Sequence, residues 1–377
     1  MDEYKSCKLQ LSNFIVTMAV PKQQKAILAL AQYAPAIIQT IDVRSPGPNE
    51  VLVRVESTSL SPGDEKVKDY GSPFIEYPVL LGFEAAGVVV QLGEGVTNLG
   101  LGDRVVFQAS VKIPLSSQYG GFQQYAITPA DIAVKIPDHV NFDQASTVLG
   151  SFGTAILGLF GDYDPESPTG GAGLTPFWRE EGKDKYKNQP ILILSGATSV
   201  GQYAIQIARL AGFFPIITTA SLHNTALLKS FGATHVIDRT LPRDQIISEI
   251  RNIVPDALPV IYDAFAIPET QKLGYDLLAP GGALVVALKP VLDREQARKE
   301  NKKIAFTYGW LHIPPNDKIG MELLRDKIPE WLRSGDIKPN NVEVIPGGID
   351  GVLVGLERLR NNQVSGKKLV VRPQETA

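Results

Sequence analysis

The stretch from residue 190 to 212 (PILILSGATSVGQYAIQIARLAG) changes its hydrophobic period once, near its middle. The apolar run at residues 191–194 predicts a buried strand, and apolar residues at helical spacing after Val200 predict a helix. Small residues form the turn between them, including Gly196 and Gly201. Because glycine lets a phosphate approach the first amides of a helix, we expect this turn to bind the pyrophosphate of a dinucleotide. The alternative is a tight turn without a ligand, since Ser199 stands where a further glycine is often found.

Strand and helix patterns continue to alternate through the C-terminal half. They predict strands at residues 215–219, 235–237, 259–264 and 283–288, and helices near 224–231, 243–253 and 268–278. This alternation indicates a parallel sheet covered on both faces, as in a doubly wound Rossmann domain. A further strand at 304–308 is expected at the sheet edge, either paired across a dimer or covered within a monomer.

The N-terminal third is rich in strands instead. Residues 51–55 alternate with period two, residues 85–90 are small or β-branched, and residues 104–107 follow a Gly-Asp turn. Glycine and proline interrupt these runs at short intervals, which predicts a compact, barrel-like β domain. Residues 141–160 then take up a helical period, and we expect them to bridge into the second domain.

Two further segments complete the chain. Residues 162–189 contain many proline, glycine and charged residues but few aliphatic ones, which predicts a long exposed loop. Such a loop is either functional or an inert surface insertion. Residues 313–371 predict an amphipathic helix around 321–332, a strand at 342–345, a helix near 352–359 and a last strand at 369–371.

The composition narrows the class of protein. Hydrophobic residues make up 44% of the 377 residues, enough for more than one core, and the net charge of −3 argues against nucleic acid or an anionic membrane as the main partner. Cys7 is the one cysteine, so a disulfide framework or a thiolate zinc cage is excluded and a cytoplasmic setting is favoured. The apolar run at residues 9–20 is too short to span a bilayer, and the acidic residues Asp2 and Glu3 disfavour a signal peptide.

The end of the second strand of the parallel sheet indicates which dinucleotide binds. In an NAD site a carboxylate at this place holds the ribose 2′-hydroxyl, and the same carboxylate would repel a 2′-phosphate. Residues 218–224 (TTASLHN) contain no acid. NADP(H) is therefore favoured over NAD(H), although Ser221 alternatively serves only to cap the following helix.

Several local motifs occur together in one order. They are GFEAAGVV from residue 82, GDRV from 102, GFQQY from 121, IPD from 136, the turn at 195–201 and FGATHVID from 231. In that order they resemble the medium-chain dehydrogenase/reductase superfamily over residues 22–373. The stretches SPGDEK (61–66), ASLHN (220–224) and GKKLVV (366–371) are most similar to its zinc-free, ToxD-like branch of quinone oxidoreductase-like proteins. That branch includes the trans-acting enoyl reductases that serve fungal polyketide synthases.

The resemblance implies an α/β fold with a GROES-like β-barrel catalytic domain and a Rossmann doubly wound parallel sheet. Its C-terminal segment returns to the β domain, which makes that domain discontinuous. We accordingly divide the chain into an N-terminal extension (1–17), a catalytic domain (18–150 and 312–377) and an NADP-binding domain (151–311).

The departures from the superfamily concern zinc. Zinc alcohol dehydrogenases place a cysteine and a histidine where this chain has Ser61 and Phe83, and the four-cysteine structural loop is absent. Without the Lewis acid, alcohol oxidation by the zinc mechanism is not expected. A metal-independent site suits hydride transfer from NADPH to the β-carbon of an α,β-unsaturated carbonyl, because the cofactor carries the chemistry and the protein orients it.

The resemblance also implies individual site residues. Lys66, Tyr70 and Tyr308 are the candidates for catalysis, although a solvated lysine and packed tyrosines are the alternatives and the proton can come from water. The implied cofactor contacts are Lys66, Thr198, Ser199, Val200, Gly201, Ser221, Leu222, His223, Asn224, Ala287, Leu288, Val364 and Ser365. To these we add Gly196 and Ala197 of the turn, and Thr154, whose hydroxyl alternatively satisfies only a helix carbonyl. The implied substrate pocket contains Leu149, Ser151, Phe152, Phe306, Thr307 and Tyr308.

Three functions remain open from the sequence. The first is reduction of an enoyl thioester held on a carrier, with a polyketide synthase as partner. The second is reduction of free enones, alkenals or quinones by the same apparatus. The third is a catalytically silent NADPH-binding protein.

Overall fold

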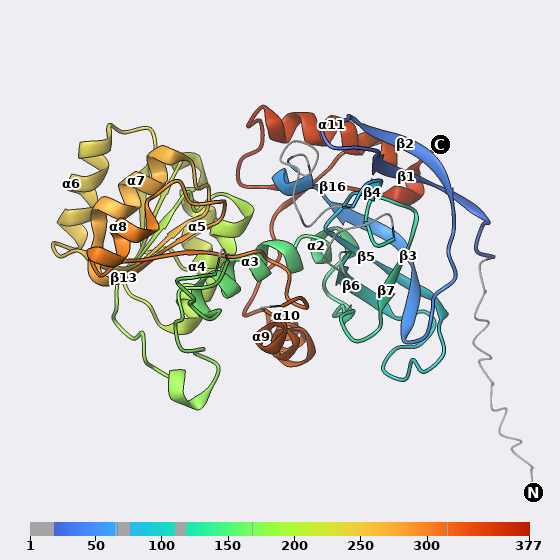
Figure 1. The fold of residues 1–377 in the computed structure, drawn as a ribbon, viewed down its shortest axis with the longest axis horizontal. Coiled ribbons are helices and arrows are strands. Elements are labelled where there is room, and N and C mark those ends of the chain that lie inside the picture. Colours follow the sequence, from blue (N-terminus) through green and yellow to red (C-terminus); the bar gives the residue numbers. More distant parts are fainter. Residues whose placement is uncertain (1–18, 65, 67–75, 110–117, 168, 315) are drawn as a thin grey trace, which may run out of the picture.

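The structure is a computed structural model that describes residues 19–64, 66, 76–109, 118–167, 169–314 and 316–377. Figure 1 shows two lobes side by side, with helix α3 (Leu149–Phe160) between them. The expected N-terminal extension, which includes Cys7, lies outside the described residues.

One lobe is built on a parallel sheet. Within the described ranges its strands lie in the order β11-β10-β9-β12-β13-β14, which is the doubly wound arrangement. The strands are β9 (Ile191–Leu194), β10 (Ile216–Ala220), β11 (His235–Asp238), β12 (Leu258–Asp263), β13 (Leu278–Val286) and β14 (Lys303–Phe306). The helices are α4 (Ser199–Ala211), α5 (Thr225–Phe231), α6 (Arg243–Ile253), α7 (Pro268–Leu277) and α8 (Arg294–Lys299). The predicted alternation is confirmed, and β14 lies at the sheet edge.

Strand β9 shows why the strands of this sheet are apolar along their whole length. Ile191 and Ile193 belong to one core cluster, whereas Leu192 and Leu194 belong to another. Since successive side chains of a strand point to opposite faces, both faces of the sheet are buried and the strand is apolar throughout. The strand order reverses between β9 and β12, and ligands of such sheets bind beyond the carboxyl ends of the strands at that point.

The other lobe is rich in antiparallel strands. In the part of the chain described, one sheet has the order β15-β16-β3-β5-β6-β8 with β7 on β3, and a smaller sheet has the order β2-β1-β4. The strands are β1 (Gln23–Ala29), β2 (Ala36–Asp42), β3 (Glu50–Ser59), β4 (Val79–Leu80), β5 (Glu84–Leu92), β6 (Arg104–Gln108), β7 (Tyr125–Pro129), β8 (Val134–Lys135), β15 (Val342–Val344) and β16 (Lys368–Val371). Helices α2 (Phe142–Ala145) and α11 (Ile349–Arg360) pack beside them. The expected class, a β-rich lobe beside a doubly wound sheet, is confirmed.

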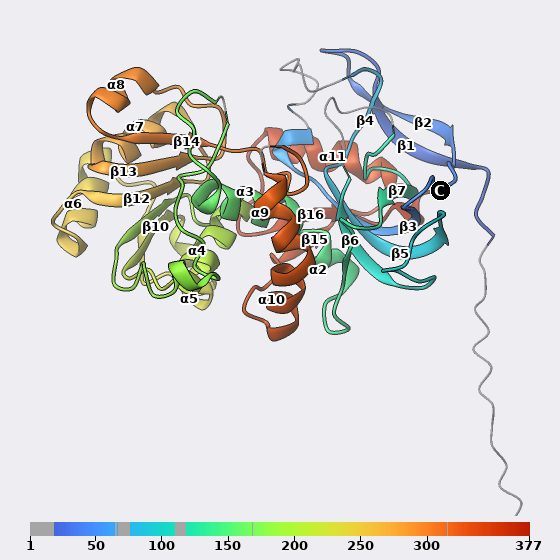
Figure 2. The same ribbon diagram turned by 60° about the horizontal axis from the view of Figure 1, so that its bottom comes forward.

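The chain crosses between the lobes more than once. Helix α3 leads into the lobe with the parallel sheet, and the segment after β14 leads out of it to the helical stretch α9 (Asp317–Glu322), η3 (Leu323–Lys327) and α10 (Ile328–Ser334) (Figure 2). Strand β16 then pairs antiparallel with β3, where Val370 faces Ser59. The C-terminal segment therefore completes the sheet that the N-terminal segment began.

The segment at residues 162–189 has no regular structure in its described part except the 3-10 turn η1 (Glu180–Gly182), so the predicted loop is confirmed, but it is exposed only in part, because some of its side chains pack against the core. Ala172 and Tyr186 are buried, and the Tyr186 ring stacks on Phe213 at 4.9 Å. Phe177 stacks on Trp331 of α10 at 5.5 Å. The packing was not predicted because the expectation rested on the few aliphatic residues, whereas aromatic side chains supply the buried surface here.

Within the described ranges, none of the helices combines the length and the apolar character that crossing a membrane requires.

Candidate functional site

The turn between β9 and α4 has the geometry that the sequence predicts. Thr198 is the N-cap of α4, and its hydroxyl accepts a hydrogen bond from Gly201 N at 3.0 Å. A Cβ on Gly196 would overlap the Thr218 hydroxyl, and a Cβ on Gly201 would lie 2.7 Å from Gly196 Cα. Both glycines are thus required for the close contact of strand and helix. The start of α4 faces the point where the strand order reverses, which is where an anionic ligand is favoured.

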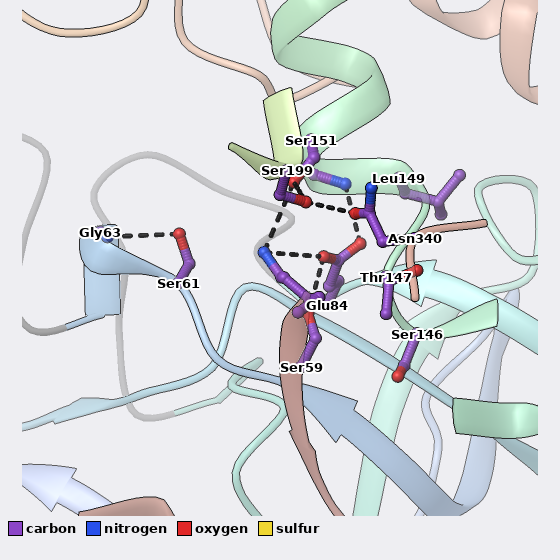
Figure 3. A network of polar contacts seen from close by, with 12 residues as sticks. Ser59, Ser61, Gly63, Glu84, Ser146, Thr147, Leu149, Ser151, Ser199 and Asn340 are labelled. Carbon is purple, nitrogen blue, oxygen red and sulfur yellow. Dashed lines mark hydrogen bonds and ion pairs between the residues drawn. The ribbon is translucent and has the colours of Figure 1, made fainter. Parts of the chain in front are cut away.

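A buried polar network meets the first turn of α4 (Figure 3). The Ser199 hydroxyl lies 2.8 Å from the Ser151 hydroxyl of α3 and also contacts Asn340 Oδ1. Asn340 Nδ2 in turn donates to Gln202 Oε1 at 2.9 Å. On the side of Ser151 away from α4, Lys368 Nζ lies 3.4 Å from the Ser151 hydroxyl. A cation on β16 therefore lies two hydrogen bonds away from the start of the helix.

Glu84 is the counterion of that lysine. Its Oε1 lies 3.8 Å from Lys368 Nζ, and the two residues are only 2% and 6% exposed. Glu84 also accepts hydrogen bonds from the Ser59 hydroxyl and from Gly150 N, both at 2.8 Å. Burial raises the pKa of Glu84, and the nearby Lys368 ammonium opposes that shift. Strand β5, strand β16 and helix α3 are thereby tied together beside the start of α4.

The two positions at which zinc enzymes carry ligands have other contacts here. Asp64, 1% exposed, accepts hydrogen bonds from Ser61 N at 2.8 Å and Gly82 N at 3.0 Å, which closes the turn that contains Ser61. Burial raises the pKa of Asp64 to about 7. The Phe83 ring packs against Gly63 and lies 5.7 Å from the Trp310 ring. Among the residues that the structure describes, no cluster of three acidic, histidine or cysteine side chains could hold a metal ion.

The carboxyl ends of β10 and β11 bring together Ser221 and a residue that the sequence analysis missed. Arg239 Nε donates to the Ser221 hydroxyl at 2.9 Å, immediately after β11. Ser221 stands at the N-cap position of the 3-10 turn η2 (Leu222–Asn224), as the alternative expects, but its side chain makes no capping hydrogen bond there. Strand order could have revealed Arg239, because the ends of adjacent parallel strands lie side by side and Ala220 pairs with Asp238.

Other predicted cofactor residues gather nearby. Asn224 Nδ2 donates to the Ser365 hydroxyl at 3.1 Å, and His223 Nε2 lies 3.3 Å from the same hydroxyl. The loop before β16 is thus in contact with the end of β10. Directly after β13, Ala287 is half-buried and Leu288 is exposed.

The remaining predicted residues have mixed surroundings. Lys66 and Tyr308 are half-buried, burial raises the pKa of Tyr308, and Tyr70 lies outside the described residues. The Thr154 hydroxyl donates to Gly150 O at 2.8 Å within α3. Leu149 and Phe152, predicted for the substrate pocket, have no exposed surface and pack in the core.

Comparison with known proteins agrees with this geometry. Residues 47–138 match the family model of the alcohol dehydrogenase GroES-like domain, and residues 199–291 match that of the zinc-binding dehydrogenases. The trans-enoyl reductase traG of Penicillium crustosum is 31% identical, over 94% of this chain and 98% of its own length. Trans-enoyl reductase caaB of Aspergillus niger is also 31% identical, with the same coverage of both chains. Among solved structures, the JamJ enoyl reductase has a similar fold, with a TM-score of 0.72 at 20% identity over 93% of this chain and 99% of that one.

Proposed function

This chain belongs to the trans-enoyl reductase family of the GroES-like, zinc-binding dehydrogenases, and from that premise we propose that it reduces an enoyl thioester with NADPH and without zinc. The observation that carries the proposal is the buried Lys368 ammonium, which lies two hydrogen bonds from the start of α4. A cation and a helix N-terminus together favour a pyrophosphate at the point where the strand order reverses.

The preference for NADPH over NADH rests on Arg239. Its guanidinium and the Ser221 hydroxyl lie together at the ends of β10 and β11, where the 2′-phosphate of NADPH would lie. Asp238, the neighbouring acid, accepts hydrogen bonds from Thr240 N at 2.9 Å and from the Thr240 hydroxyl at 2.8 Å. Its carboxylate is thus engaged with Thr240, and the donors at the strand ends suit a dianionic phosphate.

The remaining residues suit reduction of an activated double bond. The bound nicotinamide would supply the hydride to the β-carbon. The electron pair of the double bond then moves to the α-carbon and the thioester oxygen, and a proton adds at the α-carbon. A tyrosine hydroxyl is protonated at neutral pH, and burial raises the pKa of Tyr308 further, so this hydroxyl can donate a hydrogen bond to that oxygen, while the proton at the α-carbon can come from water. One well-placed donor of this kind is worth about 3 to 4 kcal/mol, so a catalytic metal is not required.

We propose that the thioester is presented by a carrier domain of a polyketide synthase, as the resemblance to trans-acting reductases suggests. Reduction of free enones or quinones and silent binding of NADPH are the competing functions. The test uses NADPH deuterated at the transferred position with a panel of enoyl pantetheine thioesters, enones and quinones. Deuterium at the β-carbon of the saturated thioester supports the proposal. Turnover of quinones alone, or binding of NADPH without any turnover, contradicts it.

A further inference from the structure

One alanine at the carboxyl ends of the parallel strands has a backbone conformation that residues with a side chain rarely adopt. Ala266, three residues after the end of β12, has a φ of 57°, in the left-handed region that favours glycine. It is 5% exposed, and it belongs to the core cluster that also contains Leu194 and Leu273. A residue keeps such a conformation only where its surroundings hold it there, and residues of this kind gather at ligand sites.

Two buried polar side chains hold Ala266. Asp263, the last residue of β12, has no exposed surface, and its Oδ1 accepts hydrogen bonds from Phe265 N at 3.2 Å and from Ala266 N at 2.8 Å. Gln271, near the start of α7, also has no exposed surface, and its Nε2 donates to Ala266 O at 2.9 Å. Both backbone polar groups of Ala266 are thus bonded to side chains that solvent does not reach, which fixes the loop at residues 264–267.

Gln271 also holds the loop that follows β13. Its Oε1 accepts a hydrogen bond from Val291 N at 2.9 Å, and its Nε2 lies 3.4 Å from Lys289 O. That loop begins with Ala287 and Leu288, for which the resemblance implies cofactor contacts. Because β12 and β13 are adjacent and parallel, one side chain on α7 connects the two neighbouring loops at their carboxyl ends.

The two loops present apolar side chains to solvent. Phe265 and Ile267 of the first loop are each 37% exposed, and Leu288 and Val291 of the second loop are 36% and 61% exposed. Exposed apolar side chains that occur together mark interaction sites. Strand β12 borders the point where the strand order reverses, and a dinucleotide binds there in a sheet of this kind. The loops therefore lie beside the site proposed for NADPH.

We propose that Gln271 and Asp263 are positioning residues for the cofactor, which hold the loops at 264–267 and 287–291 in the conformation that binds NADPH. The inference rests on the proposed function and adds to it two residues that act through the loops, since neither has exposed surface of its own. Loops that are fixed before binding cost the cofactor no affinity for ordering them. Without Gln271 the left-handed conformation of Ala266 loses one of its two supports, and the loops lose their common attachment.

The test measures NADPH affinity from the fluorescence of the bound nucleotide, without any thioester present. Gln271→Met keeps the length of the side chain and removes its hydrogen bonds, so we expect the Kd for NADPH to rise about tenfold. Glycine adopts a positive φ without strain, so Gln271→Met/Ala266→Gly should recover part of that affinity. A general loss of stability would not produce this recovery. Gln296→Met is the matched control, because Gln296 is exposed on α8 and its Nε2 donates to Glu300 Oε1.

Hydrogen exchange in the wild type provides a test that needs no variant. The amides of Ala266 and Val291 donate to buried groups, so they should exchange slowly before NADPH is added. Fast exchange that slows only when NADPH binds overturns the inference.

The outcomes separate this inference from the proposed function. Unchanged NADPH affinity in folded Gln271→Met, or a loss that Ala266→Gly does not reverse in any part, overturns the inference even if the wild type reduces thioesters. A loss that Ala266→Gly partly reverses, in a protein whose wild type reduces no thioester, supports the positioning role and overturns the proposed function. A wild type that does not bind NADPH overturns both.

Discussion

Lys368 is a charged residue in a place where charges are rarely found. It starts strand β16, is almost fully buried, and has the Glu84 carboxylate as its counterion. Removing one partner of a buried pair leaves an uncompensated charge, at a cost of about 3 to 5 kcal/mol. We therefore expect Lys368→Met to lower the free energy of unfolding by about this amount and to weaken NADPH binding, measured by denaturant titration and by fluorescence.

The double variant Glu84→Gln/Lys368→Met separates the two roles of the lysine. Without the carboxylate no buried charge is left over, so most of the stability should return. Affinity for NADPH should stay low, because the cation near the start of α4 is still missing. Recovery of affinity together with stability would show that Lys368 only neutralises Glu84.

Arg239 makes a prediction about cofactor choice. Loss of a charge-assisted hydrogen bond to a phosphate costs about 1.5 to 3 kcal/mol, so Arg239→Gln should weaken NADPH binding about tenfold or more. Binding of NADH should not change. Arg251→Gln, at an exposed arginine on α6, is the control. Parallel loss of both cofactors in Arg239→Gln would contradict a role at the 2′-phosphate.

Asp64 predicts a dependence of stability on pH. Burial raises its pKa from 3.8 to about 7, so between these values the folded state keeps a proton that the unfolded state has lost. The stabilisation that Asp64 contributes is complete below its pKa in the unfolded chain and is lost as the pH rises through its pKa in the folded protein. Between the two values the free energy of unfolding falls by about 1.4 kcal/mol per pH unit. Unfolding of the wild type and Asp64→Asn should thus show a difference that falls steadily from about pH 5 to about pH 7. A difference independent of pH would contradict the assignment.

Site residues could be predicted from the sequence where the residue types that bind the ligand stand next to one another in the chain. The end of β10 without an acid was visible in residues 218–224, and Ser221 and Asn224 do lie beside basic or hydroxyl partners. The pair of Glu84 and Lys368 was not predicted, because strand pairing across the whole chain brings them together. Glu84, a charged residue inside the apolar stretch at residues 79–90, was visible in the sequence, but Lys368 follows Lys367 at the start of an apolar run and was not marked by such a pattern.

At the level of elements, the spacing of hydrophobic residues was enough to predict the helices and strands whose stabilising contacts are local. The strand at 191–194 was predicted from a short continuous apolar run, and the following helix from apolar residues at helical spacing. The segment at 162–189 has no such period. Its structure depends on aromatic rings that meet α3 and α10, which the linear pattern does not contain.

Tyr186 tests whether this segment is part of the core. Its ring stacks on Phe213, and its hydroxyl donates to Thr175 O at 2.9 Å. Truncation of a buried aromatic residue costs about 3 to 5 kcal/mol, so Tyr186→Ala should lower the unfolding midpoint strongly. Tyr33→Ala, at a tyrosine that is 71% exposed, should change it little. Similar midpoints for the two variants, measured by circular dichroism, would show instead that residues 162–189 are not part of the core.

At the scale of the whole molecule, the site depends on segments from both lobes. The start of α4 belongs to the parallel sheet, whereas Glu84 and Lys368 come from strands of the other lobe. The parallel sheet followed from the alternation of patterns, whereas the return of the C-terminal segment to the β domain followed only from the resemblance, and the strand order and the pairing of β16 with β3 were not predicted. Such long-range pairing has no local sequence pattern, because its two partners lie at opposite ends of the chain.

The most direct test of this account is the ratio of kcat/KM with NADPH to that with NADH, measured for reduction of an enoyl pantetheine thioester in the presence of a metal chelator. We expect stoichiometric formation of the saturated thioester, a ratio of about ten or more in favour of NADPH, and no effect of the chelator. Faster reduction with NADH, or loss of activity on chelation, would contradict a zinc-independent, NADPH-dependent enoyl reductase.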